Sequence, residues 1–106
     1  MAEQLSPNSI TFEDHCDPYT TRGVRFDAFV EPGQRTIHCT VSDEALMADY
    51  GWAGPPEAES RRGAYMANRG AIQATARWKI RQGQFEQGSN DRVTVKSRER
   101  GQAAFR

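Results

Sequence analysis

Hydrophobic and polar residues alternate along two segments in the first half of the chain. In residues 24–30 (VRFDAFV) apolar side chains recur at every second position, which is typical of a half-buried strand. Residues 36–41 (TIHCTV) repeat the alternation. Between them, residues 31–34 (EPGQ) favour a turn, because proline presets φ and glycine accepts a positive φ. The two segments are therefore predicted to form an antiparallel hairpin.

The pattern then changes from strand to helix. Ser42 stands where a helix N-cap is expected, acidic residues follow it, and Gly51 suits the position after the last turn. A longer helix is predicted over residues 57–82, ending at Gly83, although Gly63 and Gly70 weaken its first turns. Its apolar stripe consists of Ala64, Ala67, Ala71, Ala74 and Trp78, flanked by Tyr65, Ile72, Ala76 and Ile80.

Two shorter segments complete the predicted fold. Val93 and Val95 alternate with polar residues as a last strand, and Ile10 and Phe12 allow an extra N-terminal strand. The sequence therefore predicts an α+β domain: a small antiparallel sheet of three to four strands, in β-β-α-α-β order, packed against one long helix. We expect one domain over residues 1–106, with an ordered core over about 10–96 and a flexible basic tail over about 97–106.

The composition and the first residues of the chain indicate the cell compartment in which the protein is expected. No apolar run approaches the ~20 residues that cross a membrane. Residues 1–14 (MAEQLSPNSITFED) have neither a basic start nor an apolar centre, so no secretory signal is predicted. We expect a cytoplasmic protein whose two cysteines are free thiols, with a disulfide between Cys16 and Cys39 as the less favoured alternative.

Five segments of the sequence resemble a family of bacterial proteins catalogued as domain of unknown function 1488. They are residues 10–14 (ITFED), 24–30 (VRFDAFV), 37–46 (IHCTVSDEAL), 64–72 (AYMANRGAI) and 76–80 (ARWKI) with the following Gly83. The resemblance covers most of residues 10–96 and implies a small bacterial α+β domain with a real N-terminal strand and no assigned activity. The turn at 32–35 is longer than the family pattern, and the basic run at 96–100 replaces an acidic, aromatic ending.

Charge is distributed unevenly along the chain, although the formal net charge is zero. Residues 1–60 carry a net charge of −8 and residues 61–106 a net charge of +8. A basic half with aromatic residues such as Trp78 is compatible with nucleic-acid binding, which needs phosphate-neutralising cations and stackable rings. The candidate contacts are Arg77, Arg81, Arg92, Lys96, Arg98 and Arg100. The alternative is that the two halves interleave in the fold and neutralise each other.

Neither a metal site nor a catalytic site is predicted. His38 and Cys39 are adjacent on a strand and point to opposite faces, and His15 and Cys16 lack a second spaced pair of ligands. Asp14, His15 and Asp17 could supply a base, but no motif places a nucleophile beside it. No phosphate-binding loop occurs, so no cofactor is predicted.

The pair Asn68 and Arg69 lies in the middle of the predicted long helix, where asparagine is unfavourable. It could present an amide and a guanidinium to a ligand, or Arg69 could pair with an N-terminal carboxylate while Asn68 caps or braces the structure. By elimination, the sequence favours a non-enzymatic protein-interaction or regulatory module that binds a protein partner or a second copy of itself as a homo-oligomer, with contacts at Phe29 and Trp52. Nucleic-acid binding is the alternative function.

Overall fold

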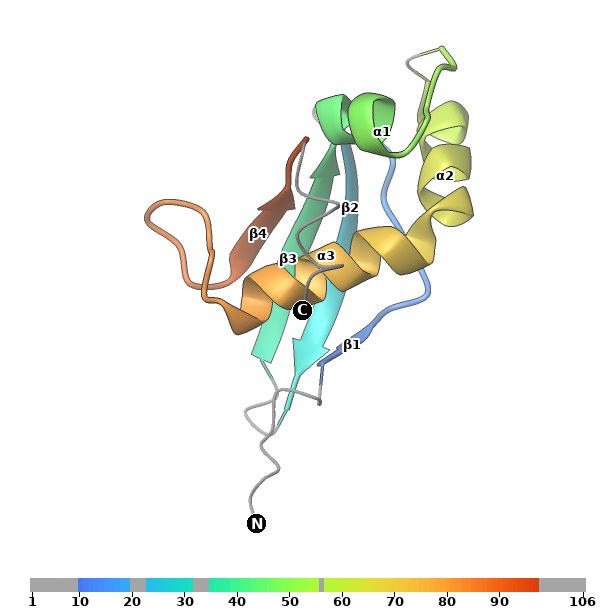
Figure 1. The fold of residues 1–106 in the computed structure, drawn as a ribbon. Helices are drawn as coiled ribbons and strands as arrows, with labels where there is room; N and C mark the ends of the chain where they lie inside the picture. Colours follow the sequence, from blue (N-terminus) through green and yellow to red (C-terminus); the bar gives the residue numbers. More distant parts are fainter. Residues whose placement is uncertain (1–9, 20–22, 32–34, 56, 98–106) are drawn as a thin grey trace.

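The computed structural model describes residues 10–19, 23–31, 35–55 and 57–97, and these residues form four strands and three helices (Figure 1). The elements are β1 (Ile10–Phe12), β2 (Gly23–Val30), β3 (Arg35–Ser42), α1 (Asp43–Asp49), α2 (Ala58–Ala67), α3 (Arg69–Arg81) and β4 (Arg92–Val95). The strands form one sheet in the order β1-β2-β3-β4. The α+β class, the hairpin and the extra N-terminal strand are confirmed.

The sheet is mixed. β1 pairs with β2 and β2 with β3 in antiparallel fashion, placing Phe26 opposite Cys39. β4 pairs with β3 in parallel, with Val93 opposite Cys39, so the prediction of a wholly antiparallel sheet is wrong for the last strand. The reason is the connection, because a helical crossover carries the chain back along the sheet, and the next strand then runs in the same direction as the one before it.

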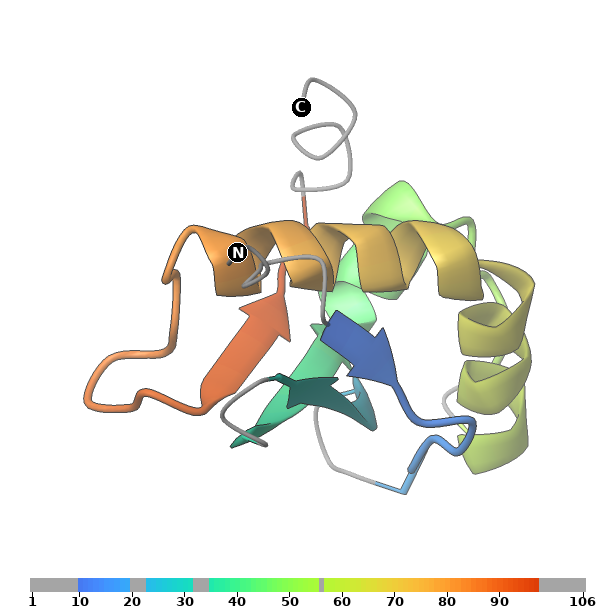
Figure 2. The ribbon, with the colours of Figure 1, turned by 90° about the horizontal axis from the view of Figure 1, so that it is seen from below.

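The helices cover only one face of the sheet. Figure 2 shows α3 lying across that face, and α1 and α2 continue the layer around the end of β3. Among the described residues, no helix lies on the opposite face. The structure is therefore a two-layer arrangement with one side of the sheet left open.

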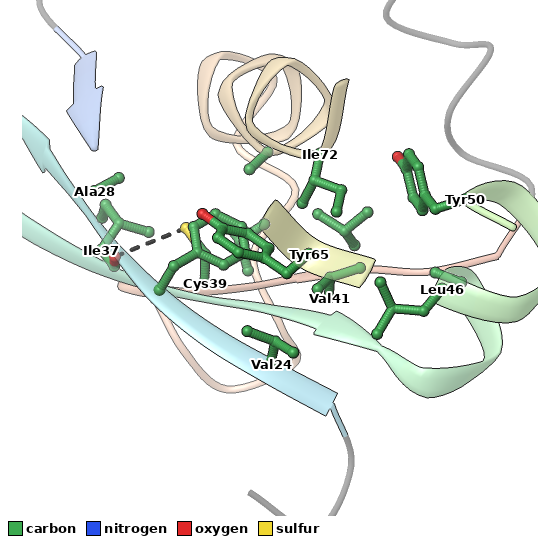
Figure 3. Packing of buried hydrophobic residues seen from close by; sticks show 14 of the residues in the cluster. Val24, Ala28, Ile37, Cys39, Val41, Leu46, Tyr50, Tyr65 and Ile72 are labelled. Carbon is green, nitrogen blue, oxygen red and sulfur yellow. Dashed lines mark hydrogen bonds between the residues drawn. The ribbon is translucent and has the colours of Figure 1, made fainter. Parts of the chain in front are cut away.

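The core lies between the sheet and the helices (Figure 3). Every second residue over 24–28, 37–41 and 93–95 faces the helical layer and is fully buried, as the alternation along a strand requires. Tyr65 is the largest fully buried side chain, and its ring lies 5.1 Å from that of Phe26. The fully buried apolar residues are Val24, Phe26, Ala28, Ile37, Cys39, Val41, Ala45, Leu46, Tyr65, Ile72, Ala76, Val93 and Val95.

The predicted long helix is in fact two helices. Asn68 separates α2 from α3 with a non-helical backbone (φ −120°, ψ 19°), and its side-chain amide donates to the carbonyls of Ala64 at 2.9 Å and Tyr50 at 3.0 Å. Asparagine favours such local bonds to the backbone over a helix interior. The chain therefore turns at Asn68, and α2 stands beside the sheet while α3 crosses it (Figure 1).

The turn also changes which side chains are buried. The predicted stripe is wrong in detail, because Ala67 is exposed, whereas Tyr65, Ile72 and Ala76 are fully buried. Lys79 lies outside the predicted stripe but is only 5% exposed, and its Nζ donates to the carbonyl of Thr94 at 2.8 Å.

The predicted helix ends agree with the structure. Ser42 caps α1 by accepting a hydrogen bond from the amide of Ala45 at 3.1 Å. Gly51 and Gly83 follow α1 and α3 with φ of 74° and 70°, a conformation that favours glycine. Most of the predicted turn (residues 32–34) and of the predicted tail (residues 98–106) lies outside the described residues.

Candidate functional site

The side of the sheet that faces away from α3, called the open face below, is polar. Side chains alternate along each strand, so the residues between the buried ones point to this face. On β2, β3 and β4 they are Arg25, Asp27, Phe29, Thr36, His38, Thr40, Arg92 and Thr94. Threonine suits such a face, because its branched side chain favours a strand and its hydroxyl favours water.

An open groove of about 1100 Å³ lies on this face, bounded by β3, β4, the start of α1 and the segment that precedes β4. Its lining residues are Arg25, His38, Thr40, Ser42, Asp43, Glu44, Glu86, Gln87, Arg92, Thr94, Lys96 and Ser97. The lining combines cationic, acidic and hydroxyl side chains and contains no Phe, Tyr or Trp. This groove is the candidate functional site.

The register of the strands places the polar side chains in rows. His38 lies between Asp27 and Arg92, and in the next row Thr40 lies between Arg25 and Thr94. Neighbouring strands are ~4.8 Å apart, so each residue lies beside its two row partners.

A hydrogen-bonded cluster spans these two rows. His38 Nδ1 lies 3.0 Å from Asp27 Oδ1 and 3.0 Å from Arg25 Nη2. Arg25 Nε also lies 3.9 Å from Asp27 Oδ1. The side chains of Arg25, Asp27 and His38 are 48%, 24% and 35% exposed, so water and ligands reach all three.

Several acidic side chains of the open face are engaged within the protein. Asp43 forms a two-pronged ion pair with Arg61, at 2.8 and 3.1 Å. Glu86 accepts a hydrogen bond from the hydroxyl of Thr94. Ser42 is occupied by its capping bond to α1. The ion pair with Arg61 offsets the charge of Asp43, and Glu44 is an exposed carboxylate at the start of α1.

The structure divides the residues proposed for nucleic-acid contact. Arg92 and Lys96 line the groove on the open face, whereas Arg77 and Arg81 belong to α3 on the opposite side of the sheet. The remaining two candidates, Arg98 and Arg100, lie outside the described residues. Arg77 and Arg81 therefore do not share a continuous surface with Arg92 and Lys96.

Arg77 also has a structural role. Its guanidinium lies 5.2 Å above the ring of Phe12 and is 3.5 Å from the carbonyl of Ile10, so it ties α3 to β1. Partial burial, together with the neighbouring charge of Arg81, lowers the pKa of Arg77.

Asn68 and Arg69 both make contacts within the fold. Asn68 joins the end of α2 to the end of α1, as described above. Arg69 pairs with Asp14 at 3.0 Å, which ties α3 to the segment after β1. The ion pair between Arg69 and Asp14 is the pairing with an N-terminal carboxylate that the sequence analysis gave as one alternative.

The other sequence candidates are dispersed. Both cysteines are free thiols. Cys39 lies in the core, where burial raises its pKa to about 12, and burial also raises the pKa of the half-buried Cys16. His15 is exposed beside Cys16. Within the described part of the chain, no group of three or more His, Cys, Asp or Glu side chains could hold a metal ion.

The two predicted aromatic contact points differ in exposure. Phe29 is 40% exposed on the open face, as a contact residue should be. Trp52 is only 9% exposed, and its indole Nε1 donates to the hydroxyl of Ser60 at 2.7 Å, so the expectation that it is exposed is wrong.

The groove itself was not foreseen from the sequence. Thr40, Thr94 and Glu86 were not singled out, and His38 was considered only as a metal ligand. A signal was present in the polar positions that alternate with apolar ones along the strands, but their grouping depends on the parallel pairing of β4 with β3.

Comparison with known proteins gives one match. A sequence model of the family described as protein of unknown function DUF1488 matches residues 10–90. Neither the curated proteins nor the solved structures contain a match to the chain. In the described residues, every helix is too short or too polar to cross a membrane.

Proposed function

Because the chain belongs to the DUF1488 family, whose description names no activity, we propose its function from the geometry: it is a protein-interaction module whose groove binds a charged segment of a partner protein. The observation that carries the proposal is the lining of the groove, in which cationic and acidic side chains face the same open space. A sheet face left uncovered by helices is a surface on which such a segment can lie.

The charges favour a protein over a nucleic acid. Arg25, Arg92 and Lys96 form the cationic part of the lining, and Glu44 and Glu86 form part of its acidic rim. A nucleic-acid backbone carries only negative charge and would meet repulsion at that rim. A peptide can carry carboxylates opposite the cations and a basic side chain opposite the rim, which is the complementarity seen at specific protein interfaces.

The shape and composition of the groove support the same conclusion. Single-stranded nucleic acids bind well where large aromatic rings stack on the bases, and no Phe, Tyr or Trp lines this groove. Threonine hydroxyls at Thr40 and Thr94 can instead exchange hydrogen bonds with the polar side chains and backbone of a peptide.

Fluorescence anisotropy tests the proposal with three labelled probes: an oligoglutamate peptide, an oligolysine peptide and single-stranded DNA. We expect oligoglutamate to bind and to weaken with salt, because its contacts are exposed ion pairs. Arg92→Gln should weaken it by roughly 1.5- to 5-fold, the effect of losing one exposed ion pair of about 0.2–1 kcal/mol.

The matched control is Arg81→Gln, which removes an exposed arginine from the helical side of the sheet. It should leave oligoglutamate binding unchanged. Failure of oligoglutamate to bind even at low salt would contradict the proposal. Tight DNA binding that is lost in Arg81→Gln and kept in Arg92→Gln would contradict it as well, and would assign nucleic-acid binding to α3.

A further inference from the structure

A single nitrogen in the groove has two partners that require opposite chemistry from it. His38 Nδ1 lies 3.0 Å from an oxygen of Asp27, which can only accept a hydrogen bond, and 3.0 Å from a nitrogen of Arg25, which can only donate one. A ring nitrogen either carries a proton or offers a lone pair, so the two hydrogen bonds cannot exist together. His38 must therefore keep one partner and release the other.

Whether Nδ1 carries a proton decides which partner His38 keeps. An imidazolium carries a proton on both nitrogens, so its Nδ1 can only donate, and it bonds to Asp27. Arg25 then loses the acceptor of its Nη2 and keeps only its longer ion pair with Asp27, so that Nη2 is available to the groove. A neutral imidazole with a lone pair on Nδ1 instead holds Arg25 beside β3 and away from a ligand.

The charges around His38 act on it in opposite directions. From β2 it faces Arg25 and Asp27, and from β4 it faces Arg92, its partner in the register. The rest of the groove contributes the charged side chains of Lys96, Asp43, Glu44 and Glu86. Asp27 favours a positive charge on His38 and the two arginines oppose it, and an anionic ligand that neutralises the arginines removes their opposition.

We propose that His38 takes up a proton when carboxylates bind in the groove, so that the module binds its partner more tightly as the pH falls through the range in which histidine titrates. The inference rests on the proposed function and adds regulation by pH to it. Because coupling between two binding events is reciprocal, proton binding favours the ligand as much as the ligand favours the proton. For one proton per complex, affinity changes by at most about tenfold per pH unit.

Isothermal titration calorimetry with the oligoglutamate peptide measures this coupling directly. The titration is run at about pH 6.5, near the ordinary midpoint of histidine, in buffers with different ionisation enthalpies. The dependence of the observed heat on the buffer gives the number of protons taken up. We expect a net uptake of between zero and one proton per complex, and tighter binding at lower pH.

Two variants test which histidine takes up the proton. His38→Gln keeps a polar side chain that cannot titrate, and it should bind the peptide without proton uptake. The chain has one other histidine, His15, which is exposed outside the groove, so His15→Gln is the matched control and should keep the uptake.

The outcomes separate the inference from the function on which it rests. Binding without proton uptake in the wild-type protein, or uptake that persists in His38→Gln, overturns the coupling and leaves the interaction module standing. Absence of any binding by the wild-type protein overturns the proposed function and the coupling with it.

Discussion

Replacing Asn68 with alanine removes the side chain that ends α2 and joins it to the end of α1. Its amide donates two hydrogen bonds, to the carbonyls of Tyr50 and Ala64, at 3.0 and 2.9 Å. Each such bond contributes about 0.5–1.5 kcal/mol, so their loss costs about 1–3 kcal/mol. Alanine regains at most about 0.7 kcal/mol through its higher helix propensity. The middle of the first range, about 2 kcal/mol, less this gain gives an expected fall of about 1–2 kcal/mol in the free energy of unfolding.

Urea denaturation followed by tryptophan fluorescence measures this loss, since Trp52 and Trp78 lie in the helical layer on either side of Asn68. A thermal melt should show a midpoint lowered by about 4–16 °C, at about 4–8 °C per kcal/mol. Asn68→Asp keeps the size of the side chain and removes its donor, so it should be at least as destabilising. Gln84→Ala, in an exposed loop, is the matched control and should change little.

The result that refutes this reasoning is an Asn68→Ala variant as stable as the wild type, or more stable. Such a variant would mean that the two hydrogen bonds of the Asn68 amide are not needed to separate α2 from α3. The break would then be set by the packing of the helices rather than by the asparagine.

Three further predictions concern stability. Gly63→Ala and Gly70→Ala should each stabilise by about 0.5–1 kcal/mol, because both glycines are helical and a Cβ would meet open space; a lower melting temperature in both would contradict this. Lys79→Met keeps the apolar stem and removes the donor to the Thr94 carbonyl, so urea unfolding should show a loss of about 1–3 kcal/mol, and unchanged stability would argue against that bond. Burial raises the pKa of Cys39 to about 12, so above about pH 9 the folded protein keeps a proton that the unfolded chain releases. Titration of Cys39 should therefore leave the free energy of unfolding unchanged below about pH 9 and lower it by up to about 1.4 kcal/mol per pH unit above that pH. An equally steep fall in the Cys39→Ala variant would assign the effect to another group.

The local features of the fold could be predicted because each depends on neighbouring residues. Period-two alternation located the strands, Ser42 marked the start of α1, and Gly51 and Gly83 marked helix ends. The direction of β4 could not be predicted in this way, because it depends on where the helices return the chain. The sequence indicated the break between α2 and α3 only through the low helix propensity of Asn68, because the hydrogen-bond partner Tyr50 is distant in sequence.

The candidate site was harder to predict than the fold. Arg92 and Lys96 were identified from charge alone, and charge does not tell which side of the sheet a residue faces. Arg77 and Arg81 were grouped with them, but they lie on α3, across the sheet. The cluster of Arg25 with His38 needs the register between β2 and β3, which no single segment specifies.

The most direct test of the account is to locate where a charged peptide binds. A titration of isotopically labelled protein with oligoglutamate, followed by ¹H–¹⁵N correlation spectra, reports the amides that change. We predict changes concentrated at the open-face positions of β3 and β4, around Thr40 and Thr94, and nearly absent from α3. Changes centred on Arg77 and Arg81 instead, or the absence of changes at any position, would contradict the claim that this groove is the binding site.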